Sequence, residues 1–330
     1  MECIVDDLKW LWKMSAAVCA HENPRAQKRG FGAVRILKRR LSYVAKSVRL
    51  INSLQVYMHP REGSPLQRIM LQRPELLGAT IWPYICLSWN AETRLRRIEE
   101  HFRAIEKLDS KLDFPVSEML ALVDLADVAT NLRVVLDQPK WFMREGLFVI
   151  NLFMQDVRIY SLAFSFAFEE GEIVTHIGAI QGVDVEGILG DYKDLTKALH
   201  GMRPRDFLVE LFRIFCRSIA VSKIYAVNDA KRQHRSSYFG AEKSEELLLN
   251  YNDIWAERGG VLEGEDFFVL SVETPMRNLD EVPSKKRAMY RRRYELLQSI
   301  EARMQCNLGV NAKESNATDT NIAQQSPVSE

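Results

Sequence analysis

The sequence lacks any long uninterrupted apolar run and any closely spaced pair of cysteines. A membrane-spanning helix needs roughly 18 to 20 apolar residues in succession, so no span is expected. The five cysteines include no C-x-x-C spacing, which argues against a disulfide framework or a cysteine zinc site. An export signal needs an apolar stretch of about 7–15 residues, and Asp6, Asp7, Lys9 and Lys13 interrupt the N-terminal one. We therefore predict a cytoplasmic protein.

Signature motifs of common enzyme classes are also absent. The chain has no G-x-S-x-G nucleophile elbow, no G-x-x-x-x-G-K-[ST] phosphate loop, no H-E-x-x-H zinc helix and no G-x-G-x-x-G loop. The acidic segment 184–194 lacks the spacing of an EF-hand loop. We therefore expect no metal site, and these motifs assign no reaction.

Charge is balanced overall but unevenly placed. The formal net charge is +1, yet residues 23–61 hold ten basic side chains and no acidic one. Two further basic groups occupy 285–287 and 291–293. Basic amphipathic helices bind anionic membrane surfaces or nucleic acid, and they also pair with acidic residues of their own chain. These basic residues could pair with acidic residues of the protein or contact an anionic membrane peripherally, and the sequence leaves both possibilities open. Nucleic-acid binding is not expected, because no recognised binding module accompanies the charge.

Apolar spacing predicts a mostly helical first half. Residues 34–57 carry an apolar stripe at helical 3-4-3-4-3 spacing, formed by Val34, Leu37, Leu41, Val44, Val48 and Ile51. Together with its basic residues, this stripe predicts a basic helix over 33–57. Asn90 is a good N-cap for a second helix over 91–108, with Leu95, Ile98, Phe102 and Ile105 facing inward.

The second half predicts a sheet with flanking helices. Residues 146–154, 157–168 and 173–181 are rich in β-branched and aromatic residues and are separated by short turns, as in an antiparallel meander. An acidic loop is expected around 184–191, then a helix over 204–220 and a strand over 223–227. A helix over 242–258, a strand over 267–272 and a last helix from Ser284 to about Met304 complete the prediction. The fold class is therefore α+β, with a helical region over 1–130, a mixed and mostly antiparallel sheet domain over 131–305, and a disordered tail over 306–330.

Dispersed blocks of the sequence resemble the VirK/YbjX family of proteobacterial proteins. The blocks are HPREGSPLQRIMLQRPELLG (59–78), IYSLAFSFAF (159–168), IGAIQG (177–182), LHGMRPRDFL (199–208), IYAVND (224–229), YNDIWAERGG (251–260) and VPSKKRAMYRRRYELL (282–297). The resemblance covers roughly residues 30–300. It implies a role in virulence, envelope stress or tolerance of antimicrobial peptides, and no catalytic residue, because the family defines none.

The order of elements over 146–273 also resembles the acyl-CoA-dependent N-acyltransferase (GNAT) fold. In that resemblance IGAIQG, which includes Gln181 and Gly182, is a bulged strand, and the helix from Pro204 holds the cofactor pyrophosphate. The Q/R-x-x-G-x-G/A loop of that fold is missing, and about 20 residues separate Gly182 from Arg203. Acyl-CoA is the cofactor that this resemblance implies.

Five further residues are candidates for binding or catalysis. Arg203 and Arg205 precede and begin a helix whose N-terminus favours anions, so they could clamp a pyrophosphate or be neutralised by Asp206 and Glu210 nearby. His234 and Asn228 follow a predicted strand, where binding residues often gather. His234 and His176 are candidate general bases, although a solvated loop histidine and a core histidine are the plain alternatives.

The leading functional hypothesis is a cytoplasmic accessory factor that binds an anionic small molecule or a partner protein. The alternative is an acyltransferase acting on a lipid, peptide or protein amine. In that alternative Arg203 and Arg205 hold the cofactor while His234 or His176 is the base. A third hypothesis is a binder of nucleic acid or of a membrane surface through the basic helix.

Overall fold

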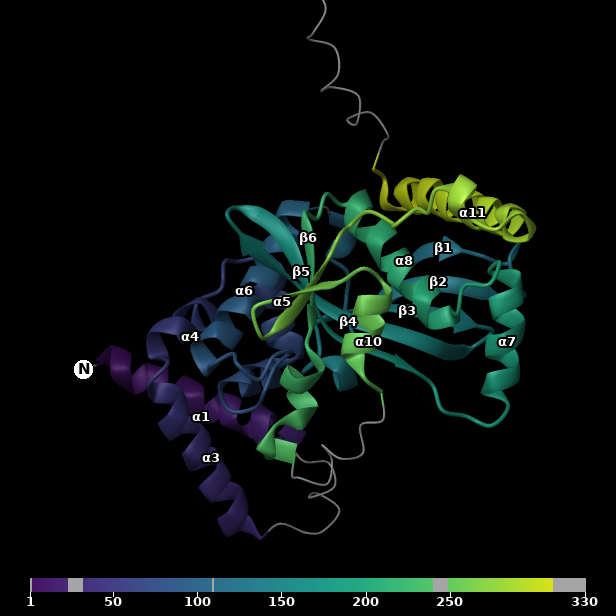
Figure 1. Cartoon of the computed structure of the whole chain (residues 1–330). Helices are drawn as coiled ribbons and strands as arrows, with labels where there is room; N and C mark the ends of the chain where they lie inside the picture. The colour runs from purple at the N-terminus through teal and green to yellow at the C-terminus, as the bar shows by residue number, and fades with distance from the viewer. Residues whose placement is uncertain (1, 23–31, 109, 240–248, 311–330) are drawn as a thin grey trace, which may run out of the picture.

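The computed structural model describes residues 2–22, 32–108, 110–239 and 249–310 of the 330-residue chain. Figure 1 shows helices from the first half of the chain gathered at one end and a large sheet at the other. The fold class is α+β, as predicted, because the helices of the first third are followed by an eight-stranded mixed sheet with helices packed against it.

The described residues of the N-terminal region form the α-helices α1 (Glu2–Glu22), α3 (Ala33–Val48), α4 (Ile51–Met58), α5 (Pro65–Gln72) and α6 (Ala91–Leu108). The prediction of one continuous helix over 33–57 is wrong, since α3 ends at Val48 and α4 begins at Ile51. The prediction for α6 is confirmed. Its N-cap is Asn90, whose Oδ1 accepts from the backbone N–H of Thr93 at 2.8 Å, and its four predicted inward residues are buried.

The sheet has the strand order β1-β2-β3-β4-β5-β6-β8-β7. Its strands are β1 (Leu120–Asp124), β2 (Leu132–Asp137), β3 (Phe148–Met154), β4 (Val157–Glu169), β5 (Glu172–Gly182), β6 (Lys223–Val227), β7 (Val261–Glu263) and β8 (Phe267–Leu270). Every neighbouring pair is antiparallel except β5 and β6, which are parallel. The predicted meander corresponds to β3, β4 and β5 and is confirmed. The sheet starts earlier than expected, because β1 lies before residue 130.

A β-bulge lies in the middle of β5. The pairing with β4 passes from Ala163↔Ala179 to Phe164↔Ile177, which leaves Gly178 without a partner. A β-carbon on Gly178 would lie 2.0 Å from the backbone oxygen of Glu145. Only glycine permits this close approach of two backbone segments. The bulge predicted for this strand is therefore confirmed.

Among the described residues after the meander, the α-helices are α7 (Ile188–Ala198), α8 (Pro204–Ser218), α10 (Tyr251–Glu257) and α11 (Ser284–Leu308). The loop predicted around 184–191 is wrong in part, because α7 begins at Ile188 and buries Ile188 and Leu195. The helix predicted over 242–258 falls partly on 240–248, outside the described residues, and its remainder forms α10. The last helix extends to Leu308, so residues 306–308, predicted to belong to a disordered tail, are helical; residues 311–330, where the rest of that prediction falls, lie outside the described part of the chain.

The core joins the helices to the meander through aromatic side chains. On α8, the ring centroids of Phe212 and Phe215 lie 4.8 and 5.8 Å from that of Phe164 in β4. On α6, the imidazole of His101 stacks on Phe166 of β4 with a centroid distance of 5.5 Å. Aromatic pairs at these distances stabilise a fold by about 0.5–1.5 kcal/mol each beyond the burial of their area.

The C-terminal helix α11 lies against α8 and the outermost strand β1 (Figure 1). Arg217 of α8 makes a two-point ion pair with Glu301 of α11, with distances of 2.8 and 3.0 Å. Two side chains near the end of α11 donate to backbone oxygens of β1, Arg303 to Asp124 at 3.1 Å and Asn307 to Leu122 at 3.0 Å. These bonds attach the helix to the edge of the sheet.

Candidate functional site

The two arginines at the start of α8 contact carboxylates of the protein itself. The Arg205 guanidinium lies 3.2 Å from Asp206 and 2.8 Å from Glu257 of α10, and its side chain is largely buried. Arg203 is exposed and lies 3.8 Å from Glu257. The charge of Arg205 is therefore shared with two carboxylates, while Arg203 is open to solvent. Anion binding by this pair stays a prediction.

The end of β5 carries two further predicted site residues. Gln181 and Gly182 are exposed, and a β-carbon on Gly182 would meet the ring of Tyr160, 2.8 Å away. Beside them, the Tyr251 hydroxyl of α10 accepts from the backbone N–H of Ile180 and donates to its oxygen, both at 3.0 Å. Tyr251 thus occupies backbone groups of β5 beyond the point where pairing with β6 stops at Ile177.

His176 lies in a cleft of about 470 Å³ at the junction of β5, β6 and β8. The cleft is lined by Ser88, Trp89, Arg97, Glu169, Val174, His176, Tyr225, Lys231, Glu263, Gly264, Glu265, Asp266 and Phe267. The imidazole stacks on Tyr225 at a centroid distance of 5.0 Å and meets Trp89 edge-on at 5.2 Å. Burial, with Arg97 and Arg96 adding to it, holds the pKa of His176 well below its usual value, so the ring is neutral.

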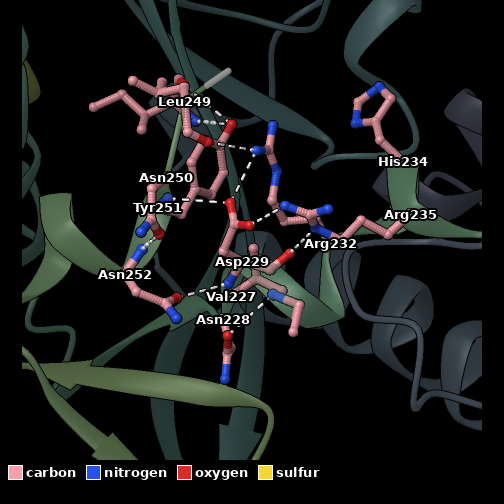
Figure 2. Close-up of polar contacts among 12 residues, drawn as sticks. Val227, Asn228, Asp229, Arg232, His234, Arg235, Leu249, Asn250, Tyr251 and Asn252 are labelled. Atoms are coloured by element: carbon pink, nitrogen blue, oxygen red, sulfur yellow. Dashed lines mark hydrogen bonds and ion pairs between the residues drawn. The ribbon is translucent and has the colours of Figure 1, made fainter. Parts of the chain in front are cut away.

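The loop after β6 is held by a hydrogen-bond network centred on Asp229 (Figure 2). Its carboxylate accepts from Arg232 at 3.1 Å, from the backbone N–H of Tyr251 at 3.1 Å and from Arg235. Its own N–H donates to Asn252 at 2.8 Å. Burial alone would raise the pKa of this carboxyl, but the Tyr251 N–H and the two guanidiniums together lower it. The network joins segment 228–235 to segment 249–252.

Two predicted residues occupy this loop. Asn228 donates from Nδ2 to the backbone oxygen of Glu265 at 2.9 Å and caps the turn that follows. Figure 2 shows the ring of His234 turned away from Asp229. Its Nε2 lies 3.0 Å from the buried carboxylate of Glu145, which also accepts from Gln233 at 2.8 Å. Asn228 therefore has a structural role, and Glu145 orients His234; the sequence did not indicate Glu145.

A second pocket, of about 380 Å³, contains four arginines. We call it the arginine pocket; it lies between α8, α10, segment 274–277 and α11. Its lining is Met202, Glu210, Arg213, Ala256, Glu257, Arg258, Gly259, Thr274, Pro275, Met276, Arg277, Tyr290, Arg293, Tyr294 and Leu297. Two glutamates face four guanidiniums, and arginine remains protonated at any physiological pH. The pocket is therefore positively charged.

Two arginines of this pocket have no carboxylate partner among the described residues. The Arg277 guanidinium makes no hydrogen bond or ion pair there, and it lies 5.9 Å from the ring of Tyr290. Arg293 lies 4.6 Å from the same ring and donates to the backbone oxygen of His200 at 2.9 Å. The ring of Tyr290 is thus within reach of both cations.

At the floor of the arginine pocket, Arg213 is almost wholly buried, with 1% of its side chain exposed. It contacts Glu210 at 3.0 Å and the backbone oxygen of Arg258 at 2.6 Å, and its Nε has no partner in the part of the chain that the structure describes. Buried polar atoms are nearly always satisfied. Unpartnered atoms of Glu210, Arg258, Thr274 and Arg293 belong to residues lining the same pocket.

The predicted site residues therefore fall into separate places. Arg203 and Arg205 lie at the start of α8, Gln181 and Gly182 lie at the end of β5, His176 lies in the aromatic cleft, and His234 lies beside Glu145. Arg293 belonged to the basic group 291–293 and Arg258 to the block 251–260, but neither was a candidate site residue. The other two pocket arginines come from distant segments, and no local pattern marks them.

Two features are absent from the described residues, 2–22, 32–108, 110–239 and 249–310. No helix there combines the length and apolarity needed to cross a membrane. No three His, Cys, Asp or Glu side chains there are grouped closely enough to hold a metal ion.

Comparisons with known proteins point to a family without an assigned activity. Residues 32–306 match the family described as "Protein of unknown function (DUF535)". An uncharacterized protein of Haemophilus influenzae is 28% identical over 224 residues, which is 67% of this chain and 72% of that protein. A second H. influenzae protein is 30% identical over 214 residues, covering 64% of this chain and 70% of the relative.

The third relative is the "Uncharacterized protein YbjX" of Escherichia coli. It is 30% identical over 150 residues, and the match spans 46% of this chain and 45% of YbjX. No solved structure matches the chain. The likeness to the N-acyltransferase fold therefore stays a prediction. With the family match over most of its length and YbjX among its relatives, the chain belongs to the DUF535 family, as the VirK/YbjX resemblance predicted.

Proposed function

We propose that the protein binds a small anionic molecule in the arginine pocket. The observation that carries the proposal is the presence of Arg277 and Arg293 in one pocket without a carboxylate partner among the described residues. Guanidinium groups bind phosphate and carboxylate through charge-assisted and often bidentate hydrogen bonds. A volume of about 380 Å³ falls within the usual range for small-molecule sites.

The VirK/YbjX resemblance supplies the cellular context of the proposal. Within it, the protein is a cytoplasmic accessory factor in envelope stress, virulence or tolerance of antimicrobial peptides, and the bound anion is what it responds to. A pocket with uncompensated positive charge fits such a binding role.

Anion binding is tested by thermal shift and calorimetry with pyrophosphate and with citrate. The two probes separate phosphate from carboxylate recognition. A ligand at 100 times its Kd stabilises a protein by about 2.7 kcal/mol. We expect one probe to raise the Tm saturably, and we expect Arg277→Ala with Arg293→Ala to abolish the rise, because both uncompensated charges are removed.

The matched control is Arg291→Ala with Arg292→Ala, which removes two exposed charges of the same helix outside the pocket. It should leave the ligand-induced shift unchanged. Equal loss in both double variants would mean that the anion responds only to the overall charge of α11, and the pocket assignment would then be wrong.

A second candidate function is N-acyl transfer. The parallel β5–β6 pair, the bulge at Gly178 and the neutral imidazole of His176 in an open cleft favour it. An amine acceptor needs a base near it, and a neutral imidazole can accept a proton. Two contacts oppose it: Arg205 is already shared by two carboxylates, and Tyr251 occupies the backbone of Ile180.

Acyl transfer requires that the protein bind acyl-CoA. Acetyl-CoA and a long-chain acyl-CoA should each raise the Tm saturably if this function is right. Arg203→Ala with Arg205→Ala should remove that rise while the unliganded protein remains folded. Normal acyl-CoA binding by the double variant would exclude these arginines as the cofactor clamp, and no shift with the wild type would exclude the function.

A further inference from the structure

The apolar stripe of α3 is exposed to solvent. Val34, Leu37 and Leu41 have exposed fractions of 67%, 48% and 53%, and Val48 is also exposed. These residues follow the 3-4-7 spacing of one helix face. On α1, Val5, Leu8 and Trp12 form a similar exposed row. Contiguous apolar surface of this kind marks an interaction site.

A different face of α3 attaches the helix to the protein. Its buried residues are Tyr43 and Ser47. Arg40 lies on that face too, because it donates to Ser15 at 2.8 Å and covers the ring of Trp12 at 3.9 Å, both on α1. Since packing on α1 uses this face, the stripe is left outward. Figure 1 shows α1 and α3 together at the corner of the molecule farthest from α11.

Cationic side chains flank the stripe. At 100° per residue, Lys38 and Arg49 project within about a quarter turn of the stripe, on the side away from α1. Lys38, Lys46 and Arg49 are exposed and make no ion pair with a described residue. No acidic residue occurs anywhere between positions 23 and 61. Internal pairing therefore does not account for these three charges.

We infer that α3 docks the protein on an anionic lipid bilayer, with Leu37 and Leu41 in the acyl boundary and Lys38 and Arg49 at the headgroups. A helix that has one apolar face and one basic face, and is too polar overall to enter the membrane, lies in the plane of a bilayer interface. Anionic headgroups attract the adjacent cations. Nucleic acid would use the cations and leave the leucines in water, so the bilayer fits both features.

The test is sedimentation of the full chain with vesicles of phosphatidylcholine mixed with phosphatidylglycerol, compared with phosphatidylcholine alone. We expect binding to the mixed vesicles that weakens with salt. Leu37→Ser with Leu41→Ser should lower the partition coefficient by at least about tenfold, because each leucine side chain contributes to burial. Lys38→Glu with Arg49→Glu should lower it by about fivefold or more for each charge.

Leu71→Ser with Leu189→Ser is the matched control, since both leucines are 79% exposed on other helices. It should bind as the wild type does. Binding that survives the α3 leucine substitutions, or absence of vesicle binding, overturns the inference. Duplex DNA binding lost in the charge variant but kept in the leucine variant would assign the surface to nucleic acid. A dimer in solution that the leucine variant dissociates would assign it to a second copy of the chain.

Discussion

Replacement of Gly178 by alanine is expected to destabilise the protein by about 4 kcal/mol or more, which ranks with the largest effects of single substitutions. The added β-carbon would lie 2.0 Å from the backbone oxygen of Glu145 and 2.8 Å from its carbonyl carbon. Backbone atoms cannot rotate away as the end of a flexible side chain can. Relief of this clash requires either β5 or the segment before β3 to move, and both segments are buried. Chemical denaturation of the purified variant measures the loss.

Gly190→Ala is the control for this substitution. Gly190 lies in α7, has an ordinary φ, and a β-carbon there meets nothing within 4 Å. Alanine should stabilise the helix at this position by up to about 1 kcal/mol. If Gly178→Ala unfolded at the same denaturant concentration as the wild type, the close approach of β5 to Glu145 would be incorrect.

Acid is expected to destabilise the fold strongly through His101. This side chain is fully buried, and burial lowers its pKa to about 3. Its Nδ1 accepts from the backbone N–H of Phe166 at 3.1 Å, so the proton of the neutral ring is on Nε2, which has no partner among the described residues. The unfolded chain takes up the proton near pH 6.5, while the folded protein does so only near pH 3. Below pH 6.5 the unfolded state binds more protons, so stability falls with falling pH by up to about 1.4 kcal/mol per pH unit.

The pH series should compare the wild type with His101→Asn. Asparagine keeps an acceptor near the position of Nδ1 but does not titrate. Its absolute stability will fall because the aromatic contacts are lost. The slope of unfolding free energy against pH between roughly 6 and 4 should become shallower by about 1.4 kcal/mol per pH unit. An unchanged slope in His101→Asn would show that His101 is not buried in the neutral form.

The meander was predictable because its strands and turns are specified by residues that are close together in the sequence. Residues 146–182 alternate strongly apolar strands with short polar turns, and a hairpin requires only its own two strands and their turn. The turn before β5 shows this, because Glu170 and Gly171 both adopt positive φ, as two-residue hairpin turns prefer. The same locality made α6 and α8 predictable, since each carries its own cap or proline and its own apolar face.

Strands β1 and β2 were not predicted because they are short, and because two of the six residues of β2, Arg133 and Asp137, are charged. Residues 132–137 read Leu-Arg-Val-Val-Leu-Asp, and they form a strand because they pair with β3 along their whole length. The break between α3 and α4 was also missed. The apolar stripe continues in sequence across Arg49 and Leu50, and this continuity indicates a single helix. In the structure the stripe of α3 is exposed to solvent, whereas α4 buries an apolar face of its own.

The candidate sites were harder to predict than the strands, because their residues are brought together by long-range contacts. Arg213, Arg258, Arg277 and Arg293 come from α8, the end of α10, a loop and α11, and only the fold brings them together. Conversely, Arg203 and Arg205 were conspicuous beside a helix start, and the structure supplies carboxylates for Arg205 from its neighbour Asp206 and from the distant Glu257. Charge in a sequence can be counted, whereas its neutralisation depends on long-range contacts.

The two ends of the sheet differ in whether another strand can join them. At β1, side chains of α11 already occupy the outward oxygens of Leu122 and Asp124. At β7, all three residues are exposed. Unpaired strand edges are templates for association with other chains. A fibre of sheets needs two open edges on each molecule, so a molecule closed at β1 can pair edge to edge only once. Any association of this kind therefore stops at a dimer.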